Sequence, residues 1–168
     1  MTADPGDPYE PITFRPIGVI RSPFSDIEGM PVQAAGAIGI AGRIELDPSL
    51  VEGLVDLETF SHLTLIYHLH RVPEVRLTVK SFLDDQYHGV FATRAPMRPN
   101  PIGLSTVRLI SISGSTLEIE DVDILDGTPL LDMKPYVPGL DDRAGAVIGW
   151  YEGRLDRVSE IKSDGRFR

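Results

Sequence analysis

The feature that most constrains the fold of this chain is a series of eight short apolar runs, each ended by glycine, proline or polar turn residues. The runs occupy residues 13–20, 37–46, 61–70, 76–82, 89–94, 103–113, 116–125 and 146–155. Short runs bounded by turn signals are typical of strands. Gly114 and Ser115, between two of the runs, form a hairpin signal. Many short strands with evenly placed turns predict an all-β fold, namely a small closed or partly open β-barrel.

Only residues 48–58 space their apolar side chains in a loosely helical way, and Gly53 weakens that pattern. We therefore expect at most one or two short helices. Residues 1–11 contain three prolines and no apolar pattern, which predicts a disordered leader. Residues 12–155 are expected to form the barrel domain, and residues 156–168 a C-terminal tail at the surface.

Composition excludes several classes of protein. The chain of 168 residues carries 16 basic and 25 acidic residues, a formal net charge of −9, so any contact with a phosphate backbone must be local. The absence of cysteine excludes disulfides, thiolate zinc sites and cysteine nucleophiles. The N-terminus lacks the pattern of a signal peptide, and no apolar stretch approaches the roughly 18 residues of a membrane span. These features predict a cytoplasmic protein without a membrane segment.

Residues 61–71 are rich in histidine and alternate strictly in polarity. The alternation predicts a strand with Leu63, Leu65, Tyr67 and Leu69 on its core face. The opposite face would carry His62, Thr64, Ile66, His68 and His70.

Three histidines and a nearby carboxylate raise the alternative of a metal-dependent, cupin-like barrel enzyme that uses His62, His68, His70 and Glu74. The glycines that flank the cupin motif are replaced here by His62 and Ser81, and no later glycine-rich segment supplies another histidine. We therefore predict no metal site. His62 and His68 are interpreted as strand histidines that bond to backbone carbonyls, and His70, at the strand end, stays a site candidate.

The stretch GVFATRAPMRPNPIG, residues 89–103, holds three prolines within six residues. Proline fixes φ and cannot donate to a strand ladder, so a rigid loop is expected. Arg94, Arg98 and Asn100 project from it, and the two arginines are forked donors suited to carboxylate or phosphate. Preorganised donors lose little entropy when a ligand binds. The alternative is a surface loop whose arginines pair with the surplus acids.

A second polar and rigid stretch, LDGTPLLDMKPY, covers residues 125–136. Asp126 and Gly127 form a tight turn, and Asp126 and Thr128 could bind ribose hydroxyls or an amine. Further along, three polar residues alternate along what would be one strand face: Asp132, Lys134 and Tyr136. A solvated strand face explains that alternation equally well.

Six motifs occur together and in a fixed order: IGVIRSPF, GMPVQ, GLVDLETFSHL, LIYHLH, GVFATRAPMRPNPIGLS and LDGTPLLDMKPYVP. Between about Ile17 and Asp141 the chain thereby resembles the TsaA-like, or TrmO, family. The resemblance implies a β-barrel methyltransferase, a homodimer and S-adenosylmethionine as methyl donor. It also implies a substrate, N6-threonylcarbamoyladenosine beside the anticodon of threonine tRNA, that gains a methyl group on N6.

The same resemblance implies a cofactor pocket formed by Gln33, Leu69, His70, Arg94, Leu125, Asp126, Gly127 and Thr128. The adjoining substrate pocket would involve Arg98, Asn100, Asp132, Lys134 and Tyr136. Two positions depart from the family pattern: Thr64 stands where many relatives have tryptophan, and Met97 where a polar residue is frequent. Some bacterial relatives carry an additional C-terminal domain thought to help hold tRNA, and this chain ends soon after the barrel.

Methyl transfer from a sulfonium needs nitrogen, carbon and sulfur in line, so positioning dominates the expected chemistry. A base that takes the N6 proton would assist, and His70 and Tyr136 are the candidates. Arg98 is expected to bind the threonyl carboxylate and so to reject unmodified adenosine. Two other hypotheses stay open: a non-catalytic sensor that binds S-adenosylmethionine, and a methyltransferase acting on another small substrate.

Overall fold

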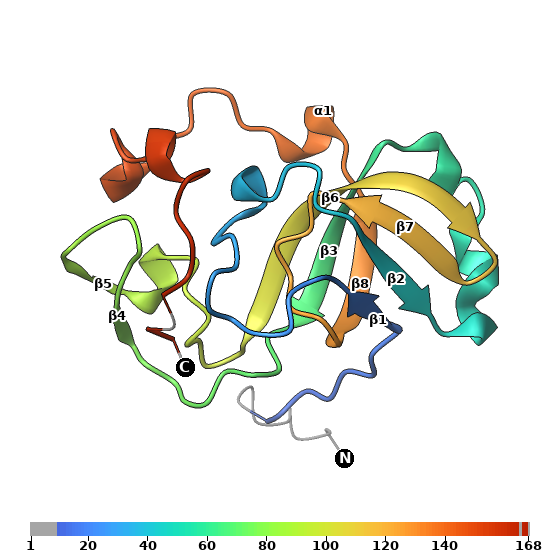
Figure 1. Ribbon diagram of the computed structural model, residues 1–168, viewed down its shortest axis with the longest axis horizontal. Coiled ribbons are helices and arrows are strands. Elements are labelled where there is room, and N and C mark those ends of the chain that lie inside the picture. Colours follow the sequence, from blue (N-terminus) through green and yellow to red (C-terminus); the bar gives the residue numbers. More distant parts are fainter. Residues whose placement is uncertain (1–9, 165, 168) are drawn as a thin grey trace, which may run out of the picture.

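A computed structural model describes residues 10–164, 166 and 167, and its centre is a closed barrel of six antiparallel strands (Figure 1). The predicted all-β barrel is therefore confirmed. Neighbouring strands around the barrel follow the order β1–β2–β7–β6–β3–β8. Their bounds are Gly18–Arg21 for β1, Gly42–Leu46 for β2, Thr116–Glu120 for β7, Ile102–Ser113 for β6, His62–His68 for β3 and Thr128–Pro135 for β8.

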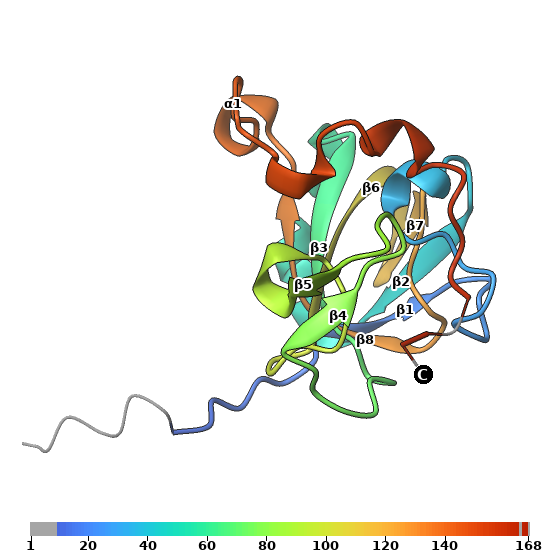
Figure 2. The ribbon, with the colours of Figure 1, turned by 90° about the vertical axis from the view of Figure 1, so that its left-hand side faces the viewer.

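A two-stranded sheet of β4 (Thr78–Lys80) and β5 (Tyr87–Gly89) lies beside the barrel in Figure 1 and in front of it in Figure 2. Helical structure in the described residues is more fragmented than expected, with one short α-helix, α1 (Pro138–Asp141), and six 3-10 segments. The 3-10 segments are Ala34–Gly36, Pro48–Leu54, Leu57–Thr59, Val90–Ala92, Gly149–Tyr151 and Leu155–Arg157. The expected helix at 48–58 is thus two 3-10 segments, separated by Asp56 in the left-handed conformation (φ 66°).

The alternation predicted for β3 is present in the barrel. Leu63, Leu65 and Tyr67 are buried, while the side chains between them are half-buried or exposed. β3 lies between β6 and β8, and Tyr67 is the register partner of Gly103 in β6. A Cβ atom at position 103 would overlap the Tyr67 ring, so glycine is required where this tyrosine crosses the neighbouring strand.

Two predicted strands are wrong, and one strand was not predicted as such. Residues 89–94 contain only the last residue of β5, followed by a 3-10 turn. Residues 146–155 form turns, because Gly149 and Gly153 adopt positive φ angles of 59° and 71° that a strand does not allow. In contrast β8 begins at Thr128, directly after the Asp126–Gly127 turn, in a segment that was not among the eight runs but whose polar alternation suggested a strand face.

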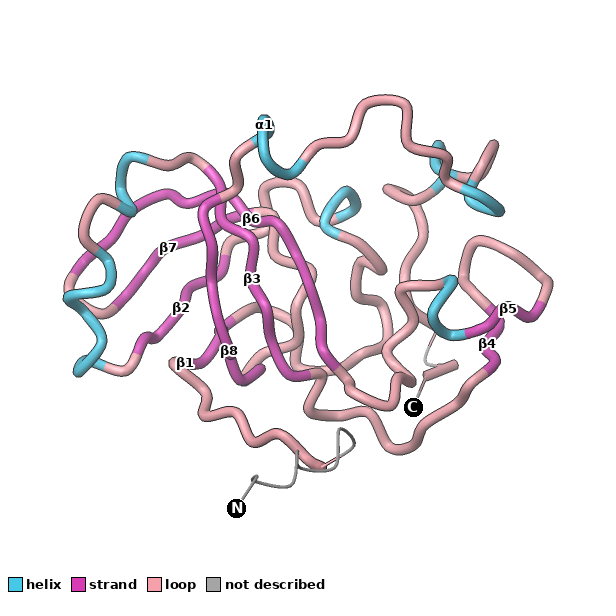
Figure 3. The backbone as a smooth tube through the Cα atoms, turned by 180° about the vertical axis from the view of Figure 1, so that it is seen from behind, coloured by secondary structure: helices cyan, strands magenta, loops and turns pink. Residues whose placement is uncertain are grey.

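The C-terminal segment does not hang from the surface as expected. Ser163 exchanges backbone hydrogen bonds of 2.8 Å with Gly29 and Met30. Phe167 is 6% exposed and joins a second apolar cluster with Val79, Val90, Ala95 and Met97. Figure 3 shows this loop-rich side, with β4, β5 and the C-terminal segment, beside the barrel strands. Of the expected leader, residues 1–9 lie outside the described residues, and residues 10 and 11 are exposed.

Candidate functional site

A cavity of about 480 Å³ lies where the end of β3, the beginning of β6 and the turn before β8 meet. The loop of residues 27–33, the proline-rich loop and the C-terminal segment complete its wall. Its volume lies within the range of small-molecule and cofactor sites, roughly 300–1,000 Å³. Loop residues from distant parts of the sequence therefore form one half-open cavity against the barrel.

Most of the residues that the sequence assigned to the cofactor line this cavity. They are Gln33, Leu69, His70, Arg94, Leu125 and Thr128, and Arg98 from the substrate set lines it too. Asp126 and Gly127 are not part of this lining. The motifs that were recognised separately along the chain thus converge on one place.

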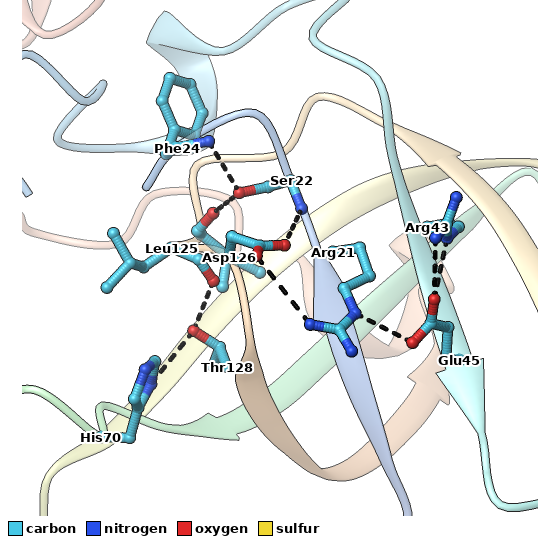
Figure 4. A network of polar contacts seen from close by, with 10 residues as sticks. Arg21, Ser22, Phe24, Arg43, Glu45, His70, Leu125, Asp126 and Thr128 are labelled. Atoms are coloured by element: carbon cyan, nitrogen blue, oxygen red, sulfur yellow. Dashed lines mark hydrogen bonds and ion pairs between the residues drawn. The ribbon is translucent and has the colours of Figure 1, made fainter. Parts of the chain in front are cut away.

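Asp126 is not part of the cavity lining and instead contacts residues at the end of β1 (Figure 4). Its Oδ1 accepts the backbone N–H of Ser22 at 3.1 Å, and its Oδ2 lies 3.9 Å from Arg21 Nη1. The Ser22 hydroxyl donates to the Ile124 carbonyl at 2.5 Å and accepts from the Phe24 N–H at 3.2 Å. These contacts hold residues 124–128 against the end of β1.

The same turn orients His70. The Thr128 hydroxyl donates its one proton to the Leu125 carbonyl at 2.6 Å, so it can only accept from His70 Nδ1, 3.4 Å away. The neutral tautomer that fits this contact carries its proton on Nδ1 and a lone pair on Nε2. Burial, with smaller contributions from Arg71 and His68, lowers the pKa of His70 and favours the neutral imidazole.

The two arginines of the proline-rich loop have different surroundings. Arg98 Nη1 donates to the carbonyls of Val90 and Thr93, both at 2.9 Å, and so fastens the loop on itself. Arg94 is exposed, and its Nη1 donates to Gln33 Oε1 at 3.4 Å, which joins two predicted cofactor residues.

Sequence reasoning missed three polar residues at this site. Tyr67 and Ser105 share a buried hydroxyl–hydroxyl hydrogen bond of 2.9 Å, and burial raises the pKa of Tyr67. Asp123 lines the cavity, burial raises the pKa of its carboxyl group, and its Oδ1 is buried without a hydrogen-bond partner in the described part of the chain. An acid inside the apolar run 116–125 was the available signal for Asp123.

Four members of the predicted substrate set do not line the cavity: Asn100, Asp132, Lys134 and Tyr136. Lys134 Nζ pairs with Asp132 Oδ2 at 2.8 Å, and the Tyr136 hydroxyl donates to Asp142 Oδ1 at 2.7 Å, which raises the pKa of Tyr136. Tyr136 follows Thr128 by eight residues, so it lies about 26 Å farther along an extended strand. The structure does not bring Tyr136 to His70 within this chain.

Among the residues that the structure describes, no group of three or more histidines, aspartates or glutamates is arranged to hold a metal ion. The four side chains of the cupin-like alternative, His62, His68, His70 and Glu74, therefore do not converge. In the same part of the chain, no helix has the length and apolar character needed to cross a membrane.

Comparisons with known proteins agree with this geometry. Residues 19–142 match the tRNA-methyltransferase O N-terminal domain, and the chain belongs to that family. A probable S-adenosyl-L-methionine-binding protein of Pyrococcus abyssi is 53% identical over 156 residues, 93% of this chain and 85% of the relative. The tRNA (adenine(37)-N6)-methyltransferase of Escherichia coli is 36% identical over 135 residues, 74% of this chain and 57% of the relative.

Solved structures lead to the same family. The crystal structure of TrmO from Pseudomonas aeruginosa superimposes with a TM-score of 0.70 and 40% identity, over 83% of this chain and 62% of that one. This chain therefore spans less than two thirds of the length of the Escherichia coli and Pseudomonas aeruginosa proteins, and most of the Pyrococcus abyssi protein.

Proposed function

We propose that this protein is an S-adenosylmethionine-dependent methyltransferase that methylates N6 of threonylcarbamoyladenosine at position 37, next to the anticodon of a tRNA. The observation that carries the proposal is the convergence of Gln33, Leu69, His70, Arg94, Leu125 and Thr128 on one cofactor-sized cavity. Membership of the tRNA-methyltransferase O family and the activity of the Escherichia coli relative support the same reaction.

The cavity suits S-adenosylmethionine, which supplies an activated methyl group when bound. Its lining is mostly apolar, as an adenosine moiety requires, and Gln33, Arg94 and Asp123 add polar groups. The braced turn Leu125–Thr128 offers backbone and hydroxyl groups to the ribose. The main task of these residues is to hold donor and acceptor in line.

His70 is the base that takes the N6 proton of the acceptor. Its Nδ1 is bonded toward Thr128, its lowered pKa keeps it neutral near pH 7, and Nε2 is left able to accept a proton. Tyr136, the other candidate, lies outside the cavity of its own chain.

Three arginines line the cavity, and within the described residues none of them forms an ion pair: Arg71, Arg94 and Arg98. They concentrate positive charge at the site of a chain whose net charge is −9. Arg98 binds the threonyl carboxylate through nitrogens other than the Nη1 that fastens the loop. An unmodified adenosine would leave that arginine without its partner, which gives selectivity.

A homodimer accounts for the residues left outside the cavity. Ile102 and Leu104, at the cavity mouth on β6, are 44% and 56% exposed, and an apolar patch of this kind favours burial against a second copy. In such a dimer Asn100, Asp132, Lys134 and Tyr136 of one protomer would complete the pocket of its partner. Size-exclusion chromatography with light scattering measures the oligomeric state directly. A monomer at micromolar concentration would contradict the homodimer.

The reaction is tested by calorimetric binding of S-adenosylmethionine, followed by mass spectrometry of nucleosides from tRNA incubated with protein and cofactor. Binding together with one added methyl on threonylcarbamoyladenosine in threonine tRNA is the expected result for a cytoplasmic tRNA-modifying enzyme. Binding without transfer to tRNA would favour a non-catalytic sensor or another small acceptor. Absence of binding would contradict the proposal as a whole.

A further inference from the structure

The cavity contains a carboxylate that forms no ion pair within the described part of the chain. Asp123 lies between β7 and β8 and lines the cavity. Its Oδ1 is the one buried side-chain nitrogen or oxygen atom, among the described residues, without a hydrogen-bond partner. A buried carboxylate that is neither paired nor fully hydrogen-bonded is unfavourable in the ligand-free protein. Such a group indicates a ligand that supplies the missing partner.

The nearest cation does not fill that role. Arg94 lines the same cavity and acts electrostatically on both Asp123 and Tyr67. Even so, no ion pair within 4.0 Å joins Arg94 to Asp123 in the described part of the chain. A guanidinium and a carboxylate that face one cavity without closing on each other leave room for a ligand carrying both charges.

We propose that Asp123 and Arg94 together bind the α-amino-acid end of S-adenosylmethionine, with Asp123 accepting from its ammonium group and Arg94 donating to its carboxylate. The threonyl group of the proposed acceptor carries a carboxylate but no ammonium, because its nitrogen belongs to the carbamoyl link. Of the two ligands, only the cofactor therefore satisfies both residues. This inference rests on the cofactor of the proposed function and not on its tRNA acceptor.

Binding of three cofactor-related ligands to Asp123→Asn separates the possible contacts. The ligands are S-adenosylmethionine, S-adenosylhomocysteine, which lacks the positive sulfonium, and 5′-methylthioadenosine, which lacks the amino-acid end. We expect the first two to lose about 10- to 100-fold in affinity, because a charge-assisted hydrogen bond is lost. Binding of 5′-methylthioadenosine, measured by competition, should change less than about threefold.

Any other pattern of affinities among the three ligands overturns the proposal. An equal loss for all three ligands would place Asp123 at the ribose or the adenine, and a loss for S-adenosylmethionine alone would place it at the sulfonium. Unchanged affinities would remove Asp123 from the site. Asp85→Asn is the matched control, because Asp85 is exposed, pairs with Lys80 of β4 at 3.2 Å and is not part of the cavity lining. No RNA is present, so a failure here leaves the proposed acceptor untouched.

Stability of the ligand-free protein gives a second measurement. Burial raises the pKa of Asp123, so the folded protein holds this proton more tightly than the unfolded chain does. Ionisation of Asp123 therefore lowers the free energy of unfolding. The loss begins as the pH rises through 3.8, the pKa in the unfolded chain, and is complete above the pKa in the folded protein. We expect Asp123→Asn to raise Tm by roughly 3 °C at pH 8 and to match the wild type near pH 3. A variant that is less stable at pH 8 would instead mark Asp123 as a structural residue and contradict its role as a ligand group.

Discussion

At the scale of single residues, the proposed mechanism makes deprotonation of the acceptor depend on Nε2 of His70. Replacing His70 with asparagine removes the base, and we expect kcat to fall by about 100-fold or more. In the wild-type protein the lowered pKa of His70 places the acid limb of the kcat/KM profile below pH 6.5, since activity is lost only as the neutral imidazole gains a proton. His68→Asn, two residues away and exposed, should keep the rate and shift the acid limb only slightly upward, because His68 makes a smaller contribution to the lowered pKa of His70. An unchanged acid limb in the His70 variant would exclude this base.

Gly103 provides a residue-scale test of how the RPNPIG motif shapes the site. An alanine there would force the Tyr67 ring away from β6 and from its hydrogen bond with Ser105. We expect Gly103→Ala to destabilise the protein by about 2 kcal/mol in urea unfolding. Gly53→Ala, where an added Cβ meets nothing within 4 Å, should change stability by less than about 1 kcal/mol. Equal effects at the two positions would mean that Tyr67 adapts without cost.

How far residues could be predicted from sequence depended on whether their role is local. The inward face of β3 followed from alternation alone, because burial on one side of a strand repeats every second residue. Arg98 and Asp123 could not be resolved in this way. The carbonyls that hold Arg98 and the missing partner of Asp123 both depend on how distant loops pack.

At the scale of elements, the turn before β8 is positioned by β1. Ser22→Ala removes the donor to the Ile124 carbonyl and leaves the Phe24 N–H without its acceptor. We expect the KM for S-adenosylmethionine to rise about tenfold, because the turn loses its position, while kcat stays within about twofold. Ser22→Thr should rescue most of the effect, and the exposed Ser113→Ala should have none. A fall in kcat with unchanged KM would contradict a positioning role.

The C-terminal segment is a second element that shapes the site, because it supplies both a cavity wall and part of the second apolar cluster. The Phe167 ring packs edge-on to Phe82, with the ring centroids 5.1 Å apart. Phe167→Ala should therefore cost about 3 kcal/mol in urea unfolding. The exposed Phe91→Ala is the control, and similar losses for both would mean that the segment is not docked in solution.

Prediction of elements failed where a short apolar run buries single side chains from turns and not one face of a strand. Residues 146–155 have the composition of a strand, yet Gly149 and Gly153 turn the chain so that Tyr151 and Leu155 reach the cavity. A run of this length does not distinguish a strand from a loop that buries a few side chains. The barrel strands were predicted more reliably because their turns and alternation agree.

At the scale of the whole molecule, binding of tRNA has to overcome a net charge of −9 through a few local contacts. Of the three arginines that line the cavity, Arg94 and Arg98 are assigned to carboxylates of the cofactor and the acceptor, which leaves Arg71 for a phosphate. We therefore expect a slope of log kcat/KM for tRNA against log salt of about −0.7, the value for one phosphate of a single-stranded loop. Arg71→Gln should abolish most of this slope, whereas Arg43→Gln, which breaks an exposed pair with Glu45, should leave it unchanged. A slope steeper than about −5 would mean more phosphate contacts than three arginines can make. It would require an extended basic surface, which a second copy of the chain or another protein would have to supply.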